Sequence, residues 1–86
     1  MSRGIRNGDY VKVAWVDSAS MDGWRRVEQG EDLALSDCIT IGHLLNRKGG
    51  AVRIAGTTDD SSGLAIHLIV IPTVAVTSIT RLIEAE

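Results

Sequence analysis

The single proline of the chain, Pro72, divides its apolar C-terminal third into two strand-like segments. The segment before it, "LAIHLIVI", is an apolar run, interrupted by His67, that proline ends, because proline has no backbone N–H to donate to a sheet. The segment after it, residues 76–81, alternates well enough to predict a last strand. One short turn separates the two strands, so the sequence predicts a sheet that bends strongly between them.

Three earlier segments have the length and the β-branched content of strands. They are residues 9–17, 38–46 and 51–58. The last two are joined by "NRKGG", whose glycines allow the positive φ angles of a tight hairpin turn. A second polar turn, "DDSSG", leads into the apolar run before Pro72. In residues 9–17 the alternation predicts that Trp15 shares a face with Val11 and Val13 and lies in the core.

The segment between the first two strands is interrupted by Gly23 and Gly30 and has little regular pattern. We predict a loop, a short extended piece over residues 24–29, and at most one helical turn over residues 31–37, with Glu31 and Asp32 at its N-terminus. The whole pattern predicts an all-β fold: a small five-stranded, strongly bent antiparallel barrel of SH3-like or Sm-like type, with at most one short helical turn. It forms a single domain over residues 1–86, with residues 1–8 as a flexible N-terminus.

The size and the charge of the chain limit the kinds of partner that we expect it to have. A chain of 86 residues buries a limited apolar surface, so we expect a homo-oligomer. Its formal net charge of −2 means that contact with nucleic acid requires a local basic patch. The N-terminus lacks the apolar run of a signal peptide, and no apolar run is long enough to span a membrane. With one cysteine and no disulfide pair, this pattern predicts a cytoplasmic protein without membrane contact.

The sequence offers little for catalysis or metal binding. The two histidines, His43 and His67, lie inside predicted strands, and Cys38 lies in an apolar run without basic neighbours. There is no nucleophile elbow, and two histidines without a nearby carboxylate or thiolate cluster do not make a metal site. We therefore predict a protein that is not an enzyme and has no catalytic residue, metal or cofactor.

Two groups of residues have the chemistry of a binding site. Trp24 is followed directly by two arginines, so it can stack on a base while cations meet phosphate, or it can anchor a subunit interface. The hairpin turn carries two more cations, and polar side chains that can bind hydroxyl groups precede Trp24. The predicted ligand-binding residues are Trp24, Arg25, Arg26, Asp17, Ser18, Ser20, Arg47 and Lys48.

Several short motifs occur in a fixed order along residues 10–82. They are W-x-D-S (Trp15–Ser18), GW (Gly23, Trp24), C-x-x-x-G (Cys38–Gly42), T-x-D (Thr58–Asp60 or Thr57–Asp59), and I-P followed by I-x-x-L (Ile71, Pro72, Ile79, Leu82). In this order and spacing the chain resembles a family of short proteins of tailed bacteriophages. Its ending is also similar to that of Sm-like barrels, whose last two strands carry subunit contacts, but the N-terminal helix and uridine-binding motif of that family are missing.

The resemblance to phage proteins implies a role in binding. Small non-enzymatic phage proteins often act against bacterial immunity, and some sequester the nucleotide signals that defence systems use. The leading prediction is therefore sequestration of a nucleotide-derived immune signal in a pocket at or near a subunit interface. One alternative is a protein-interaction module that inhibits a host factor or acts in a virion. Another is an Sm-like binder of single-stranded nucleic acid, which the acidic charge balance and scarce aromatics make the weaker candidate.

Overall fold

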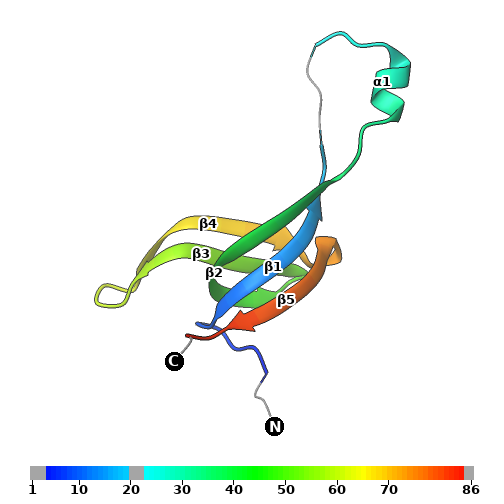
Figure 1. The fold of residues 1–86 in the computed structure, drawn as a ribbon. Coiled ribbons are helices and arrows are strands. Elements are labelled where there is room, and N and C mark those ends of the chain that lie inside the picture. The colour runs from blue at the N-terminus through cyan, green and yellow to red at the C-terminus, as the bar shows by residue number, and fades with distance from the viewer. Residues whose placement is uncertain (1–3, 20–22, 85–86) are drawn as a thin grey trace.

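Five antiparallel strands form one curled sheet in the computed structural model, which describes residues 4–19 and 23–84 (Figure 1). The strands are β1 (Tyr10–Asp17), β2 (Ser36–Lys48), β3 (Ala51–Asp59), β4 (Leu64–Pro72) and β5 (Val76–Leu82). Their order across the sheet is β4-β3-β2-β1-β5. The predicted five-stranded, antiparallel all-β fold is confirmed. Within the described residues β4 and β5 do not pair, so the structure shows a curled sheet with two edges and not a closed barrel.

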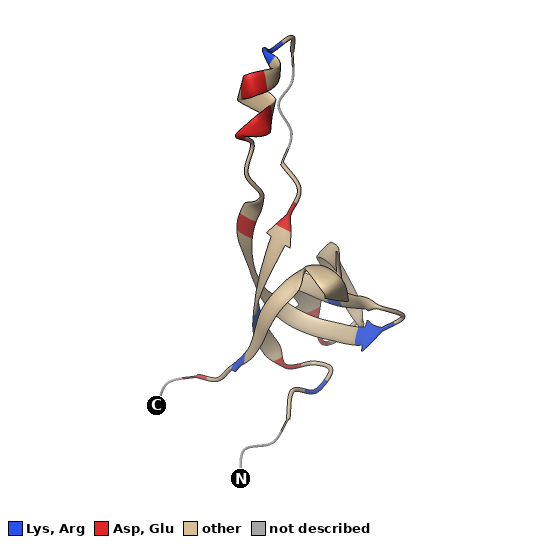
Figure 2. Cartoon of the chain, turned by 90° about the vertical axis from the view of Figure 1, so that its right-hand side faces the viewer, with Lys and Arg blue, Asp and Glu red and all other residues tan. Residues whose placement is uncertain are grey.

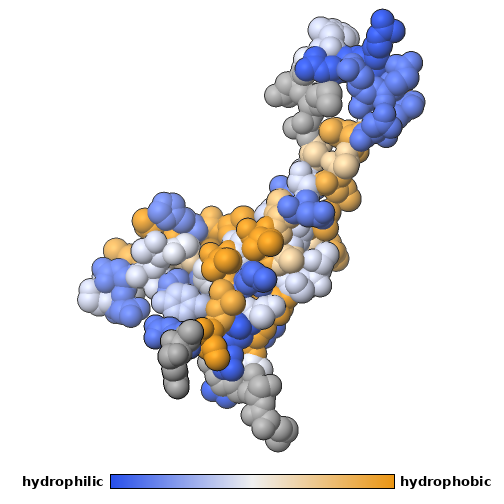
Figure 3. Space-filling model, in the orientation of Figure 1, coloured by the Kyte–Doolittle hydropathy of each residue, from blue (hydrophilic) through white to orange (hydrophobic). Residues whose placement is uncertain are grey.

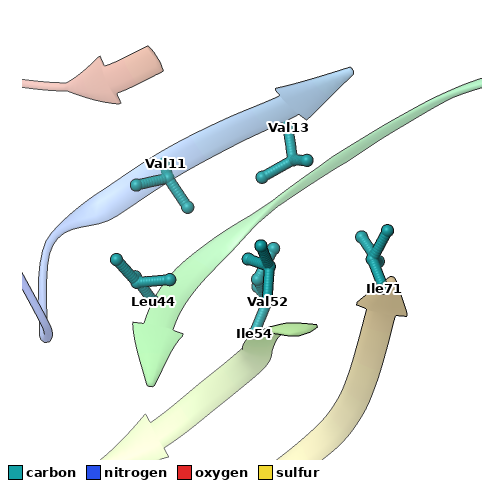
Figure 4. Close-up of a cluster of buried hydrophobic side chains, with 6 residues drawn as sticks. All are labelled: Val11, Val13, Leu44, Val52, Ile54 and Ile71. Atoms are coloured by element: carbon teal, nitrogen blue, oxygen red, sulfur yellow. The ribbon is translucent and has the colours of Figure 1, made fainter. Parts of the chain in front are cut away.

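The core lies inside the curl of the sheet (Figure 4). Alternate residues of β1 point into it, and Val11 and Val13 are fully buried. Trp15 packs against the edge of this cluster, as its place in the alternation predicts, and its Nε1 donates a hydrogen bond of 3.0 Å to Thr40 Oγ1. The buried cluster is small, which fits the limited surface that a chain of this length buries. It consists of Val11, Val13, Leu44, Val52, Ile54 and Ile71.

The sheet bends where β2 changes partners. The first part of β2 pairs with β1 up to His43, and the second part pairs with β3, with a register shift between Leu44 and Asn46. Such an irregularity bends and twists a strand. At the bend Gly42 is buried against β3, and a Cβ at this position would lie 2.5 Å from the carbonyl oxygen of Ala55. Only glycine allows the two backbones to come this close.

The turns after β2 and β4 lie where the glycines and the proline of the sequence predict them. Gly49 and Gly50 connect β2 to β3 with φ angles of 62° and 73°. After β4 a single 3-10 turn, η1 (Thr73–Ala75), leads into β5, as the position of Pro72 predicts. The N-terminal segment, predicted to be flexible, is tied to the sheet at two points: the Gly8 N–H donates to Leu44 O, and the Arg47 guanidinium donates to Ile5 O.

The helical turn lies earlier in the chain than the sequence predicted. It is α1 (Val27–Glu31), so the predicted extended piece over residues 24–29 and the helical turn over residues 31–37 are both wrong. The Gln29 side chain explains the difference, because its Oε1 accepts a hydrogen bond of 3.1 Å from the Arg26 backbone N–H at the start of the helix. Glu31 is consequently the last residue of the helix and not near its N-terminus. In the part of the chain that the structure describes, no helix has the length and apolar character needed to cross a membrane.

Candidate functional site

Residues 18–35 connect β1 to β2 and are here called the arm; its described residues project away from the sheet (Figures 1 and 2). All arm residues from Gly23 to Leu35 are exposed, so the sheet does not cover them. Trp24 is the extreme case, with a side chain that is 100% exposed. A tryptophan is normally well buried in a folded protein. Trp24 therefore does not contribute to the core of this chain.

The two arginines after Trp24 share the same exposed part of the arm. Arg25 Nη1 donates a hydrogen bond of 3.0 Å to the Trp24 carbonyl oxygen. Arg26 is exposed and is the N-cap residue of α1, where its backbone N–H donates a hydrogen bond to Gln29 Oε1. Gly23, with a φ of 87°, sets the direction of the chain just before this group. The structure thus places the consecutive residues Trp24, Arg25 and Arg26 on a projecting loop, as the glycine-broken sequence predicted.

Two of the predicted hydroxyl-binding residues, Asp17 and Ser18, lie at the base of the arm. Asp17 ends β1, and its Oδ1 accepts a hydrogen bond of 2.8 Å from the Ser18 backbone N–H. Both side chains are exposed. Ser20 lies outside the described residues. The Asp17 carboxylate is therefore partly used in shaping the start of the arm.

The two predicted cations of the hairpin lie in another part of the molecule. Arg47 and Lys48 end β2 beside the Gly49–Gly50 turn, and Figure 2 shows this turn well apart from the arm. Arg47 is used in holding the N-terminal segment through its bond to Ile5, whereas the Lys48 side chain is exposed. Within one copy of the chain, the structure does not bring Trp24 together with Arg47 and Lys48.

The two histidines and Cys38 have separate surroundings. The His43 ring lies against the Tyr10 ring, with centroids 4.3 Å apart, and His67 is exposed on β4 close to Gly56. The Cys38 Sγ lies 3.7 Å from the Ser36 carbonyl oxygen, its weak hydrogen-bond acceptor. No group of three or more His, Cys, Asp or Glu that could hold a metal ion occurs among residues 4–19 and 23–84.

The sequence analysis missed an apolar surface on the edge strand β4. Alternate side chains of β4 point to the face of the sheet opposite the core, where they are 55–68% exposed. We call these residues the outer strip: Leu64, Ile66, Leu68 and Val70. A continuous apolar run predicts a strand buried on both faces, so nothing in the sequence indicated that one face is open. A shallow hollow at one end of the strip is lined in part by Thr57, Asp59 and Leu64.

The Asp59 carboxylate organises the turn beside this strip. Its oxygens accept hydrogen bonds from the hydroxyl groups of Ser61 (2.7 Å) and Ser62 (2.8 Å). These bonds favour the charged form and lower the pKa of Asp59 below its usual value of 3.8, with the Ser61 hydroxyl as the largest cause. Asp59 therefore stays a negative charge at the end of the outer strip.

Comparison of the chain with protein-family models, with curated proteins and with solved structures found no match.

Proposed function

We propose that the protein acts by binding, without catalysis, and that the tip of its arm recognises a protein partner. The observation that carries this proposal is Trp24, fully exposed on a projecting arm with Arg25 and Arg26 beside it. Tryptophan and arginine are the residues that most often dominate the binding energy of protein interfaces. An exposed indole also gains the most from being covered by a partner.

The shape of the arm favours a protein partner over an enclosed small molecule. A small ligand is normally held in a concave pocket that covers most of its surface. Two hollows in the described part of the chain are lined by residues of β3, β4 and the C-terminal end of β5, and by Tyr10 of β1. A projecting side chain instead fits into a groove on another protein. We expect that groove to be apolar where it accepts Trp24 and acidic where it meets the two guanidinium groups.

The second candidate is sequestration of a nucleotide-derived immune signal by a phage-type protein. Its support is the same tip, because an indole can stack on a base while Arg25 and Arg26 neutralise phosphate. Arg47 and Lys48 lie away from the arm in one copy, so in this candidate they must come from a second copy that completes the site. The net charge of −2 leaves single-stranded nucleic acid as the weaker third candidate.

Fluorescence of Trp24 separates the candidates. In a Trp15→Phe background Trp24 is the only tryptophan, and its exposed indole reports directly on stacking. Nucleotide sequestration predicts strong quenching by a member of a panel of cyclic dinucleotides, cyclic trinucleotides and ADP-ribose derivatives at micromolar concentration. A nucleic-acid binder predicts quenching by single-stranded oligonucleotides that weakens steeply with salt. A protein-binding arm predicts no quenching by any of these.

Affinity capture from host lysate then tests the arm directly. The wild-type chain should recover a stoichiometric partner, and Trp24→Ala and the double variant Arg25→Ala/Arg26→Ala should each lose it. The matched control is Val74→Ala, which alters a side chain that is 98% exposed on η1, outside the arm. Retention of every captured protein by Trp24→Ala would contradict the proposal.

A further inference from the structure

The outer strip of β4 is an apolar surface that its own chain leaves uncovered. Ile66 and Leu68, at its centre, are 55% and 64% exposed, and Figure 3 shows apolar residues gathered on one face of the molecule. Antiparallel pairing continues this face across the sheet, because directly opposed residues point to the same side. Leu68 lies opposite Ala55, Ala55 opposite His43, and His43 opposite Tyr10. This row of residues across the outer face contains no Asp, Glu, Lys or Arg.

The edge position of the strip makes its lack of charge unusual. Edge strands of monomeric proteins normally carry charged side chains that prevent association, and β4 carries no Asp, Glu, Lys or Arg from Leu64 to Pro72. A left-handed residue, His67 with a φ of 58°, lies in the middle of the strand and is unpaired with β3 in the ladder. This kink opposes a continuous new ladder along the edge of β4. The outer face, and not the edge, is consequently the surface available to a partner.

The total surface of the chain is also larger than that of a stable monomer. The chain exposes 6782 Å², whereas a folded monomer of 9.2 kDa exposes about 4,900 Å². Its radius of gyration is 16.6 Å, compared with about 12 Å for a compact domain of this length. The excess of about 1,900 Å² exceeds the roughly 800 Å² that each partner buries in a standard interface. Exposed apolar side chains of this surface lie on the arm and the outer strip, and also at Ile39 and Ile41 of β2 and at Tyr10, Val74 and Ile83.

The charges at the two ends of the strip are opposite and therefore complementary to those of a second copy. Asp59 lies opposite Leu64 on the outer face at one end, and Arg53 lies opposite Val70 at the other. A two-fold axis that sets two strips antiparallel, face to face, brings each Asp59 near the partner copy's Arg53. A parallel arrangement would instead oppose like charges. In such a two-fold contact each copy uses the same surface, so the outer strip of one copy packs against the outer strip of the other.

We infer that the outer strip is the interface of a two-fold dimer, in which two copies pack the outer faces of β4 antiparallel. The interface is apolar at its centre around Ile66 and Leu68, with Asp59 and Arg53 at its ends. The two arms remain outside it, so each dimer presents Trp24 twice. This inference does not depend on the proposed function, because it concerns different residues.

Sedimentation equilibrium of the full chain tests the dimer. The wild-type mass should be about twice 9.2 kDa at micromolar concentration, and Ile66→Lys/Leu68→Lys should weaken association at least tenfold, because burying two ammonium groups is costly. Both side chains are exposed, so the fold is retained, which circular dichroism verifies. The matched control Val74→Lys should not change the mass, and neither should Trp24→Ala. A monomeric wild-type chain at 100 µM, or a mass well above two copies, overturns the inference.

Disulfide crosslinking tests the antiparallel arrangement in a Cys38→Ser background. A mixture of Leu64→Cys and Val70→Cys chains should form a disulfide-linked heterodimer, because residue 64 of one copy faces residue 70 of the other. Neither variant alone should crosslink efficiently. Efficient crosslinking of Leu64→Cys with itself, or no crosslinking in the mixture, overturns the arrangement.

Discussion

Gly42 and Ala55 hold β2 and β3 in a contact that excludes any side chain at position 42. A Cβ on Gly42 would lie 2.5 Å from the Ala55 carbonyl oxygen and 2.7 Å from Ile54 Cγ2. The contact lies where β2 passes from β1 to β3, so it fixes the bend of the whole sheet.

We expect Gly42→Ala to lower the free energy of unfolding by about 1–3 kcal/mol, the usual cost of overpacking a core. Urea denaturation measures this loss. Gly30→Ala is the control, because Gly30 is exposed in α1 and nothing lies within 4 Å of its added Cβ. Equal stability of Gly42→Ala and the wild-type chain would show that the strands separate without cost.

His67 is the one described residue other than glycine that has a positive φ angle. A left-handed conformation costs about 1–2 kcal/mol for a residue with a Cβ. We expect His67→Gly to raise the free energy of unfolding by about 1 kcal/mol, and His67→Val to lower it, because a β-branched side chain tolerates this conformation least. The thermal midpoints of the two variants should therefore move in opposite directions, and a shared direction would argue that the kink carries no strain.

The hydrogen bond between Trp15 and Thr40 closes the edge of the core. Thr40→Val keeps the shape but leaves the part-buried indole N–H without its acceptor, so we expect a loss of about 1 kcal/mol. Trp15→Phe/Thr40→Val should lose less than the sum of the two single variants, because both singles break the same bond. Additive losses in this double-mutant cycle would mean that the bond contributes nothing to stability.

The turn after β3 should make stability depend on pH below the usual pKa of Asp59. The Ser61 and Ser62 hydroxyl groups lower this pKa in the folded state, so the bonds stabilise the fold above the unfolded value of 3.8. That contribution is lost as the pH falls through the lower, folded value. We expect NMR titration to give a pKa below 3.8, and Ser61→Ala to raise it. The stability difference between wild type and Ser61→Ala should shrink on acidification from pH 6 to pH 3, and a constant difference would contradict this account.

The arm should be dispensable for folding. Asp17 and Ser36 lie opposite each other in the β1–β2 ladder, so a two-residue Asn-Gly turn can replace residues 18–35 and join the strands directly. We expect the shortened chain to keep its β-sheet circular dichroism and to lose partner capture. Its unfolding midpoint in urea measures the effect on stability. Loss of the folded sheet would show that the arm is part of the core structure.

The sequence by itself determined the strands and their turns. The alternation in β1, the glycines after Lys48 and the stop at Pro72 act over neighbouring residues, so they can be found without knowing the fold. The glycine-broken surroundings of Trp24 predicted a loop or edge position for it, whereas its full exposure came only from the structure. The sequence predicted the helical turn a few residues too late in the chain. A hydrogen bond between the Gln29 side chain and the Arg26 backbone fixes the start of α1, and this bond leaves no periodic signal in the sequence.

Only the tertiary structure decided which apolar residues are covered and which predicted site residues meet. The run before Pro72 is apolar on both faces apart from His67, and Ile66 and Leu68 are open because no described element covers the outer face of the sheet. Trp24 and Lys48 were grouped by chemical type, but the path of β2 carries them to different parts of the molecule. Burial and proximity depend on contacts between residues distant in the chain, whereas periodicity and turn chemistry depend on neighbours.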